Sequence, residues 1–139
     1  MKSHPVVEHI YRRLRACCCA AKADAAGAED NLAGARRLAE EVPSRSAKYE
    51  THQGAGRAYL LLGRNEAALA ELQAAVQLAL HPLERHSTNY WLARAAEAAG
   101  HRQEAARLLT LVTADRFDTW MCADARARLN SSSGDPRAT

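Results

Sequence analysis

The sequence contains few of the residues that favour β-sheets. Its 139 residues include five valines, one isoleucine and one phenylalanine, whereas alanine occurs 31 times and leucine 16 times. β-Branched and aromatic side chains suit half-buried strands, whereas alanine and leucine are among the strongest helix formers. The length supports one domain around a single core. We therefore expect an all-α domain and exclude a mostly-β fold.

Long apolar runs and a secretory signal are also missing. A membrane-spanning helix needs about 18 or more consecutive apolar residues, and the chain has no such stretch. The N-terminal region is positively charged, but Arg12, Arg13 and Arg15 interrupt the apolar segment that a signal peptide requires. These absences predict a cytoplasmic protein with no membrane partner.

Neither sign of charge dominates. The chain has 19 lysines and arginines against 16 aspartates and glutamates, a net charge of +3 at pH 7, and the charges are spread along its length. Nucleic-acid-binding proteins usually gather their basic residues into one patch, so we expect no nucleic-acid partner. Of the basic residues 16 are arginine, a bias that suits bidentate contacts with carboxylates and that genome base composition equally explains.

Cysteine is too sparse and too clustered for a disulfide framework. Cys17, Cys18 and Cys19 are consecutive, and Cys122 is the fourth cysteine. Neighbouring residues of a helix point about 100° apart, so these three cannot bridge one another. We expect free thiols in a reducing compartment. The triplet is interpreted as small apolar packing residues, and a redox or acylation site is the alternative because basic residues nearby would favour a thiolate.

The sequence shows no catalytic or metal-binding constellation. It has neither a glycine-rich phosphate loop nor a G-x-S-x-G elbow. Metal sites need ligands at convergent spacings such as C-x2-C. We expect no enzyme activity, no cofactor and no metal ion. The histidines are expected to be exposed or to cap helices: His4, His9, His52, His81, His86 and His101.

Prolines, glycines and capping residues predict seven helices. Pro5 suits a first helical position, and Pro43 and Gly27 are expected to end helices. Short polar side chains at Ser44 or Ser46, at Asn65, and at Asp115 with Asp118 are expected to cap helix starts. The expected ranges are about 5–26, 29–42, 44–62, 66–80, 83–100, 102–114 and 116–129, followed by a polar, disordered tail over 130–139.

The stopping glycines indicate an internal repeat. Gly27, Gly63 and Gly100 are 36 and 37 residues apart, and each stands between two helical patterns. Such units bury their apolar faces by stacking on one another. We expect a single domain over 1–129, a right-handed α-solenoid of three antiparallel helix pairs over 5–42, 44–80 and 83–114 with a capping helix over 116–129.

At these positions the chain resembles the tetratricopeptide repeats. That family has a small residue seven before the turn glycine, an aromatic four before it, alanine five after it and a large apolar residue nine after it. The middle unit matches with Gly56, Tyr59, Gly63, Ala68 and Leu72. The third matches less completely with Leu92, Ala93, Gly100, Ala105 and Leu109, because Ala96 stands where the aromatic is expected. The first unit departs from the pattern, with Ala23 for the aromatic and Arg36 for the large apolar residue. The segment from Tyr90 also resembles helical repeats of soluble lytic transglycosylases.

The resemblance implies a concave groove lined by the first helix of each pair. The residues three, six and ten before the turn glycine would look into it, together with Trp91: Leu60, Arg57 and Gln53 in the middle unit and Glu97, Arg94 and Tyr90 in the third. It implies a non-catalytic scaffold or adaptor that binds a peptide or protein segment, and the arginines would suit an acidic one. The alternative is an Arg94–Glu97 pair on a solvated face with Trp91 in the core.

Two other functions remain open. The last helix carries Phe117, Trp120 and Met121, which would either cap the core or form a homodimer contact in a self-associating regulatory or assembly module. The transglycosylase-like segment would also suit an accessory domain of a cell-wall or signalling enzyme. The lysine and asparagine pattern with which some tetratricopeptide repeats clamp chaperone carboxyl termini is absent, which disfavours that partner.

Overall fold

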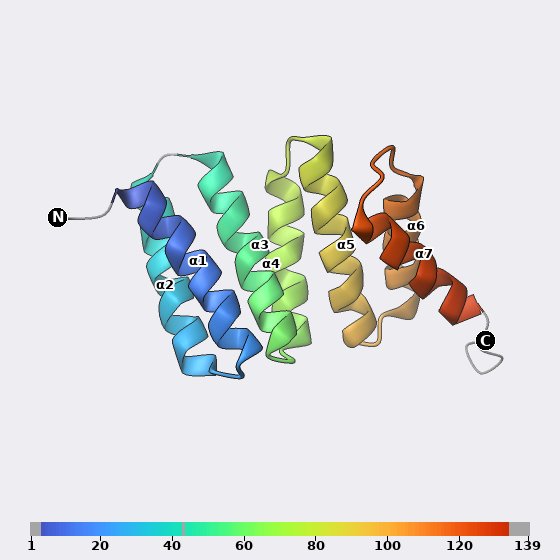
Figure 1. The fold of residues 1–139 in the computed structure, drawn as a ribbon, viewed down its shortest axis with the longest axis horizontal. Helices are drawn as coiled ribbons and strands as arrows, with labels where there is room; N and C mark the ends of the chain where they lie inside the picture. Colours follow the sequence, from blue (N-terminus) through green and yellow to red (C-terminus); the bar gives the residue numbers. More distant parts are fainter. Residues whose placement is uncertain (1–3, 43, 134–139) are drawn as a thin grey trace.

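The computed structural model describes residues 4–42 and 44–133. Within these residues the regular structure is entirely helical, as expected, and strands are absent. The elements, shown in Figure 1, are α1 (Pro5–Ala21), α2 (Ala25–Glu41), α3 (Arg45–Leu61), α4 (Asn65–Leu78), α5 (Pro82–Ala98), α6 (Arg102–Ala114) and α7 (Trp120–Ser133).

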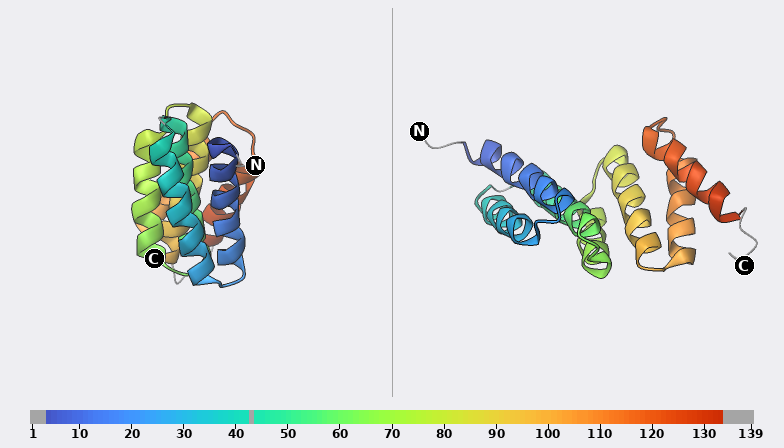
Figure 2. Two further views of the ribbon diagram at one scale, coloured as in Figure 1. Left: turned by 90° about the vertical axis from the view of Figure 1, so that its left-hand side faces the viewer. Right: turned by 60° about the horizontal axis from the view of Figure 1, so that its bottom comes forward.

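The helices pack in consecutive pairs along the long axis of the molecule. Helices α1 and α2, α3 and α4, and α5 and α6 pack against each other, and α7 packs on α6. The odd-numbered helices also touch in order, α1 with α3, α3 with α5, and α5 with α7. We call the surface formed by these four helices the odd-helix face. Turned views show the successive pairs displaced and rotated relative to one another (Figure 2).

The turns inside the three pairs have the same hydrogen bonds. Ala23, Gly63 and Gly100 occupy the left-handed region, with φ of 60°, 75° and 84°. In each turn the N–H of the next residue donates to a carbonyl near the end of the preceding helix. These bonds join Asp24 N to Cys19 O at 2.8 Å, Arg64 N to Tyr59 O at 2.9 Å, and His101 N to Ala96 O at 2.8 Å.

The expected end of the first helix at Ala26 was wrong, because the turn forms at Ala23 and Gly27 lies inside α2. The carboxylate of Asp24 caps α2, with Oδ1 accepting from Gly27 N at 2.9 Å, and this cap starts α2 before the expected Glu29. Gly27 does not end a helix, and its lack of a side chain leaves room for the side chains of Asp24 and Cys19. A Cβ atom there would lie 2.2 Å from Oδ2 of Asp24 and 3.0 Å from Sγ of Cys19.

Aligning the units on Ala23 restores the repeat in the first pair. Arg36, which the glycine spacing put in a core position, is partly exposed and donates to Glu71 Oε1 at 2.8 Å. The four positions that define the repeat are buried in all three pairs: Ala16, Cys19, Ala28 and Leu32; Gly56, Tyr59, Ala68 and Leu72; Ala93, Ala96, Ala105 and Leu109.

The caps of α3 and α4 were predicted with different success. Ser44 caps α3 as expected, with Oγ accepting from Ala47 N at 3.3 Å. Asn65 is the first residue of α4 rather than its cap, and its amide donates to Ala98 O of α5 at 3.0 Å.

At α7, Thr119 takes the capping role expected of Asp115 and Asp118, since its hydroxyl accepts from Cys122 N at 3.3 Å. Helix α7 continues to Ser133, beyond the expected end at Leu129. Pro43, expected to end the second helix, and residues 134–139 of the expected tail lie outside the described residues.

Candidate functional site

The side chains of Arg57 and Trp91 join α3 to α5 on the odd-helix face. The guanidinium carbon of Arg57 lies 4.4 Å from the ring centroid of Trp91, a cation–π contact. Arg57 is exposed, and among the described residues it has no carboxylate within ion-pair distance. This arrangement leaves an oriented positive charge available to a ligand.

Trp120, at the start of α7, extends the aromatic surface. Its ring lies edge-on to Trp91 at 6.2 Å and to Tyr90 at 5.2 Å between centroids, and 62% of its surface is exposed. The sequence analysis assigned Trp120 to a core cap or a dimer contact. Its place beside Trp91 follows from the packing of α7 on α5, which the residue spacing did not reveal.

Tyr90 forms the floor of this cluster, because only 1% of its surface is exposed. Its hydroxyl donates to Asp124 Oδ2 at 2.5 Å and accepts from Arg94 Nη1 at 3.0 Å. Burial and the bond to Asp124 raise the pKa of Tyr90. The same bond from Tyr90, followed by the Arg128 guanidinium, lowers the pKa of Asp124. Tyr90 therefore fixes α7 against α5 through its hydroxyl.

Arg94 and Glu97 belong to a network of charges between α5 and α7. Arg94 Nε lies 3.9 Å from Glu97 Oε1, so the pair that the alternative interpretation expected is present. Glu97 also accepts from Arg128 Nη1 at 2.9 Å, and Arg128 Nε donates to Asp124 at 2.6 Å. Arg94 and Arg57 thus differ, because Arg94 is engaged by neighbouring side chains whereas Arg57 rests on a ring.

Gln53 and Leu60 complete the set of expected site residues. The Gln53 amide donates to Tyr49 Oη at 3.1 Å and to Ser87 Oγ at 3.2 Å, which links α3 to α5 one turn from the Arg57–Trp91 contact. Leu60 is half-buried and packs against the core, as does Trp91. Gln53 also borders an open depression of about 590 Å³ whose wall includes Phe117.

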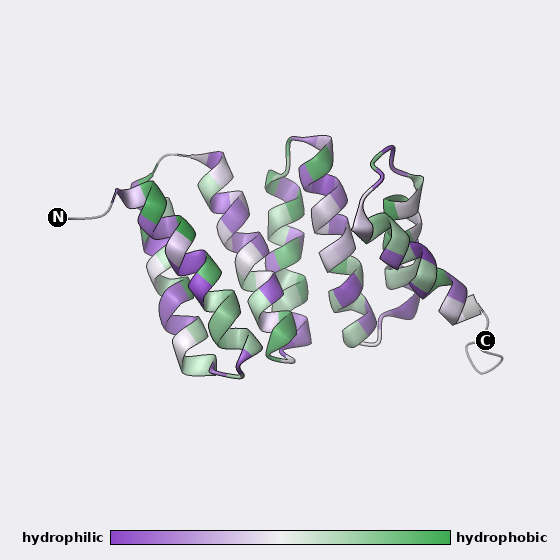
Figure 3. Cartoon of the chain, viewed as in Figure 1, coloured by the Kyte–Doolittle hydropathy of each residue, from purple (hydrophilic) through white to green (hydrophobic). Residues whose placement is uncertain are grey.

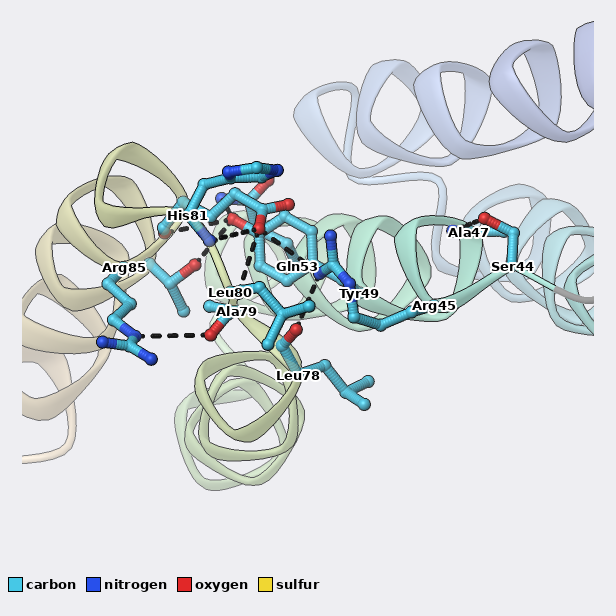
Figure 4. Close-up of polar contacts among 12 residues, drawn as sticks. Ser44, Arg45, Ala47, Tyr49, Gln53, Leu78, Ala79, Leu80, His81 and Arg85 are labelled. Atoms are coloured by element: carbon cyan, nitrogen blue, oxygen red, sulfur yellow. Dashed lines mark hydrogen bonds and ion pairs between the residues drawn. The ribbon is translucent and has the colours of Figure 1, made fainter.

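The link between α4 and α5 beside this depression is held by two polar side chains. Arg45 donates to Leu78 O at 2.7 Å (Figure 4). Arg45 also lies 3.3 Å from the Glu84 carboxylate. Glu84 in turn accepts from the N–H groups of Leu80 and His81, both at 3.1 Å. Burial opposes ionisation of Glu84, but these bonds outweigh it and lower its pKa. The rim of the site is therefore fixed by hydrogen bonds to backbone.

Two histidines that the sequence analysis expected to be exposed or capping are buried. His9 Nε2 lies 2.7 Å from Thr51 Oγ1. His86 bridges Asp115 at 2.7 Å and Thr119 at 2.8 Å. Throughout the described ranges, no three His, Cys, Asp or Glu side chains converge in a way that would hold a metal ion.

The cysteine triplet is divided among three environments. Cys19 is buried, Cys17 is half-buried and donates to Gly54 O at 3.6 Å, and Cys18 is exposed. Burial raises the pKa of the Cys17 thiol, although Arg57 and Arg13 act in the opposite direction. Cys17 thus packs between α1 and α3.

Comparison with protein-family models, curated proteins and solved structures finds no match to this chain. The repeat is therefore defined by its own turn geometry and buried positions. In the described part of the chain, helices with the length and apolar character needed to cross a bilayer are absent.

Proposed function

We propose that the chain is a cytoplasmic, right-handed tetratricopeptide-like solenoid that acts as a non-catalytic adaptor. It binds an acidic peptide or protein segment along a groove on the odd-helix face. The observation that carries the proposal is the exposed Arg57 guanidinium held over Trp91 beside Trp120, without a carboxylate partner among the described residues.

The chemistry of this cluster suits a carboxylate next to an apolar side chain. A guanidinium stacked on a ring keeps its N–H groups free at the edge, where they can bind a carboxylate in a bidentate way. Trp120 adds exposed aromatic area of the kind that dominates binding energy at protein interfaces. Arg57 therefore contacts the ligand charge, and Trp120 packs against a neighbouring ligand side chain.

The other expected site residues support the surface from below and beside it. Gln53 and Leu60 hold α3 in place, and Tyr90, Arg94 and Glu97 hold α7 against α5. Because these contacts are made before a ligand arrives, the protein loses little conformational freedom on binding. We expect Arg94 to contribute less to ligand affinity than Arg57.

A displayed library of random peptides, panned against the whole chain, tests the proposal. Peptides rich in Asp and Glu with an aromatic or aliphatic neighbour are expected to be enriched. Binding can be followed directly, because the chain has two tryptophans, Trp91 and Trp120, and both lie in the cluster. A bound peptide is expected to change their fluorescence.

Matched variants locate the binding surface. Arg57→Ala is expected to weaken binding of an enriched peptide about tenfold, the effect of losing one charged hydrogen bond. Trp120→Ala is expected to weaken it as well. Arg37→Ala removes another exposed arginine, on α2, and is the control. Equal affinity of wild type, Arg57→Ala and Trp120→Ala, with unchanged helicity, would contradict the proposal.

A further inference from the structure

Helix α1 presents an apolar stripe to solvent. Val7, Tyr11 and Leu14 have 59%, 54% and 55% of their surfaces exposed, and Cys18 and Ala21 are also exposed. Their spacings alternate between four and three residues, which places them on one narrow side of the helix, as at the seam between two packed helices. We call these five residues the α1 outer face. Apolar residues recur along the whole of α1 (Figure 3).

The same side of the later odd-numbered helices is covered by the preceding pair. In α3 this side faces α1, where Thr51 is hydrogen-bonded to His9 and the carbonyl of Gly54 accepts from Cys17. Helix α5 turns it toward α3, where Thr88 meets Tyr49. Counted from Ala23 and Gly63, four of the five residues of the α1 outer face correspond to buried positions of α3, namely Ala47, Thr51, Gly54 and Ala58, whereas Ala21 corresponds to the exposed Leu61.

The two ends of the stack are unlike. Apart from Trp120, the exposed residues of α7 up to Asn130 are small or polar, namely Ala123, Arg126, Ala127 and Asn130. Stacked repeats end in such polar surfaces when they end in water. The α1 end has large apolar residues instead, namely Val7, Tyr11 and Leu14.

We propose that the α1 outer face is the interface between two copies of this chain. Two α1 helices pair around a twofold axis near Leu14, so that the large apolar side chains of each copy cover those of the other. A 17-residue helix limits the area buried. The dimer is therefore reversible, with a dissociation constant on the order of micromolar.

The charges beside the stripe favour antiparallel pairing. Glu8, whose carboxylate also lies 3.0 Å from Arg12 Nε of the same helix, and Lys22 flank the same edge near opposite ends of α1. Antiparallel helices bring Glu8 of one copy to the level of Lys22 of the other, and their macrodipoles oppose each other favourably. The two Arg15 side chains lie at the rim near the axis, where their long stems let the guanidinium groups separate into water.

Sedimentation of the full chain under reducing conditions, over a range of concentrations, tests the interface. Wild type is expected to pass from monomer to dimer, and Leu14→Glu to raise the dissociation constant at least about tenfold. Tyr11→Glu is the second interface variant. Leu111→Glu, at an exposed leucine of α6, is the control and is expected to dimerise like wild type.

The interface differs from the ligand surface, so Arg57→Ala is expected to leave dimerisation unchanged. A wild-type chain that stays monomeric at all concentrations would overturn the proposal. Equal dimerisation of the Leu14→Glu, Tyr11→Glu and wild-type chains, all with native circular dichroism, would do the same.

Disulfide trapping tests the antiparallel arrangement. In a chain with Cys17→Ala and Cys18→Ala, the added substitution Leu14→Cys is expected to give a disulfide-linked dimer under mild oxidation, since position 14 meets its own copy at the axis. Val7→Cys in the same background is expected to stay unlinked, because antiparallel helices hold residue 7 far from its copy, whereas parallel helices would bring the two together. Leu111→Cys is the control and is also expected to stay unlinked. Linkage through Leu111→Cys and none through Leu14→Cys would overturn the pairing.

Discussion

Nε2 of His9 in α1 lies 2.7 Å from the hydroxyl oxygen of Thr51 in α3, and both side chains are buried. The Thr51 hydroxyl donates its proton to Ala47 O at 2.7 Å, so the ring nitrogen of His9 is the donor in the pair. The contact therefore joins the first and second helix pairs through an N–H of the His9 ring.

Acid is expected to destabilise the chain through His9. Burial, followed by the charge of Arg13, lowers the pKa of His9 below its ordinary value of 6.5, while Glu50 acts in the opposite direction. The unfolded chain then binds a proton at higher pH than the folded chain. The stabilisation that neutral His9 contributes is fully present above pH 6.5 and is lost as the pH falls toward the pKa of His9 in the folded chain.

Urea unfolding at pH 7.5 and pH 5 measures this effect. The loss of unfolding free energy between the two conditions is expected to be smaller in His9→Gln than in wild type. His4→Gln, at an exposed position, should retain the wild-type loss. An identical loss in all three chains would show that His9 does not carry the pH dependence.

Ala23→Gly is expected to stabilise the chain. A non-glycine residue in the left-handed region costs about 1–2 kcal/mol, which the substitution removes. The greater conformational freedom of glycine in the unfolded chain reduces this gain by about 0.5–1 kcal/mol. The expected net gain in unfolding free energy is about 1 kcal/mol. Gly63→Ala and Gly100→Ala should lose a similar amount, since neither site has an atom within 4 Å of an added Cβ. Destabilisation by Ala23→Gly would contradict the turn assignment.

Gly56→Ala tests the close packing of α3 on α4. An added Cβ would lie 2.4 Å from Cγ of Leu72, so the Leu72 side chain or one of the two helices must shift, at a cost of about 1–3 kcal/mol. Gly34→Ala is the control, because its Cβ would meet the flexible side chain of Arg12 at 3.3 Å. The double variant Gly56→Ala with Leu72→Ala should lose less unfolding free energy than the sum of the losses in the two single variants. Full additivity would argue against the contact.

Tyr90→Phe is expected to loosen α7. The change removes the hydroxyl between Arg94 and Asp124 and should lower the unfolding free energy by about 1–2 kcal/mol. Because Trp91 and Trp120 both touch the Tyr90 ring, the folded chain should also change its tryptophan emission. Tyr11→Phe, at an exposed tyrosine, serves as the control. Native emission and stability in Tyr90→Phe would contradict the role of the hydroxyl.

Local sequence signals predicted the helix pairs but misplaced the first turn. Gly63 and Gly100 mark their turns because glycine enters the left-handed region easily. Ala23 adopts the same conformation although it is not a glycine, so the sequence analysis placed the first turn at Gly27. The available signal was Asp24, whose carboxylate reaches the backbone three residues later, as a helix cap does.

The site was predictable where it depends on one helix and not where it depends on two. The resemblance to tetratricopeptide repeats implied that Gln53 and Arg57 share one side of α3 and that Tyr90 and Arg94 share one side of α5, with Trp91 adjacent. The sequence did not indicate that Asp124 of α7 accepts from the Tyr90 hydroxyl or that Arg128 binds Asp124. It also did not indicate that Trp120 lies beside Trp91. Those relationships arise when α7 packs against α5, between residues about 30 positions apart in the chain.

The contacts between helices also set how the chain folds. Within the described residues, α1 and α2 contact only each other and α3, and the remaining contacts likewise join neighbouring pairs. Contacting residues are therefore close in sequence, which favours fast folding, since short loops close at low entropic cost. Amide hydrogen exchange should accordingly show separate protection for each pair, with the middle pair, supported from both sides, exchanging last.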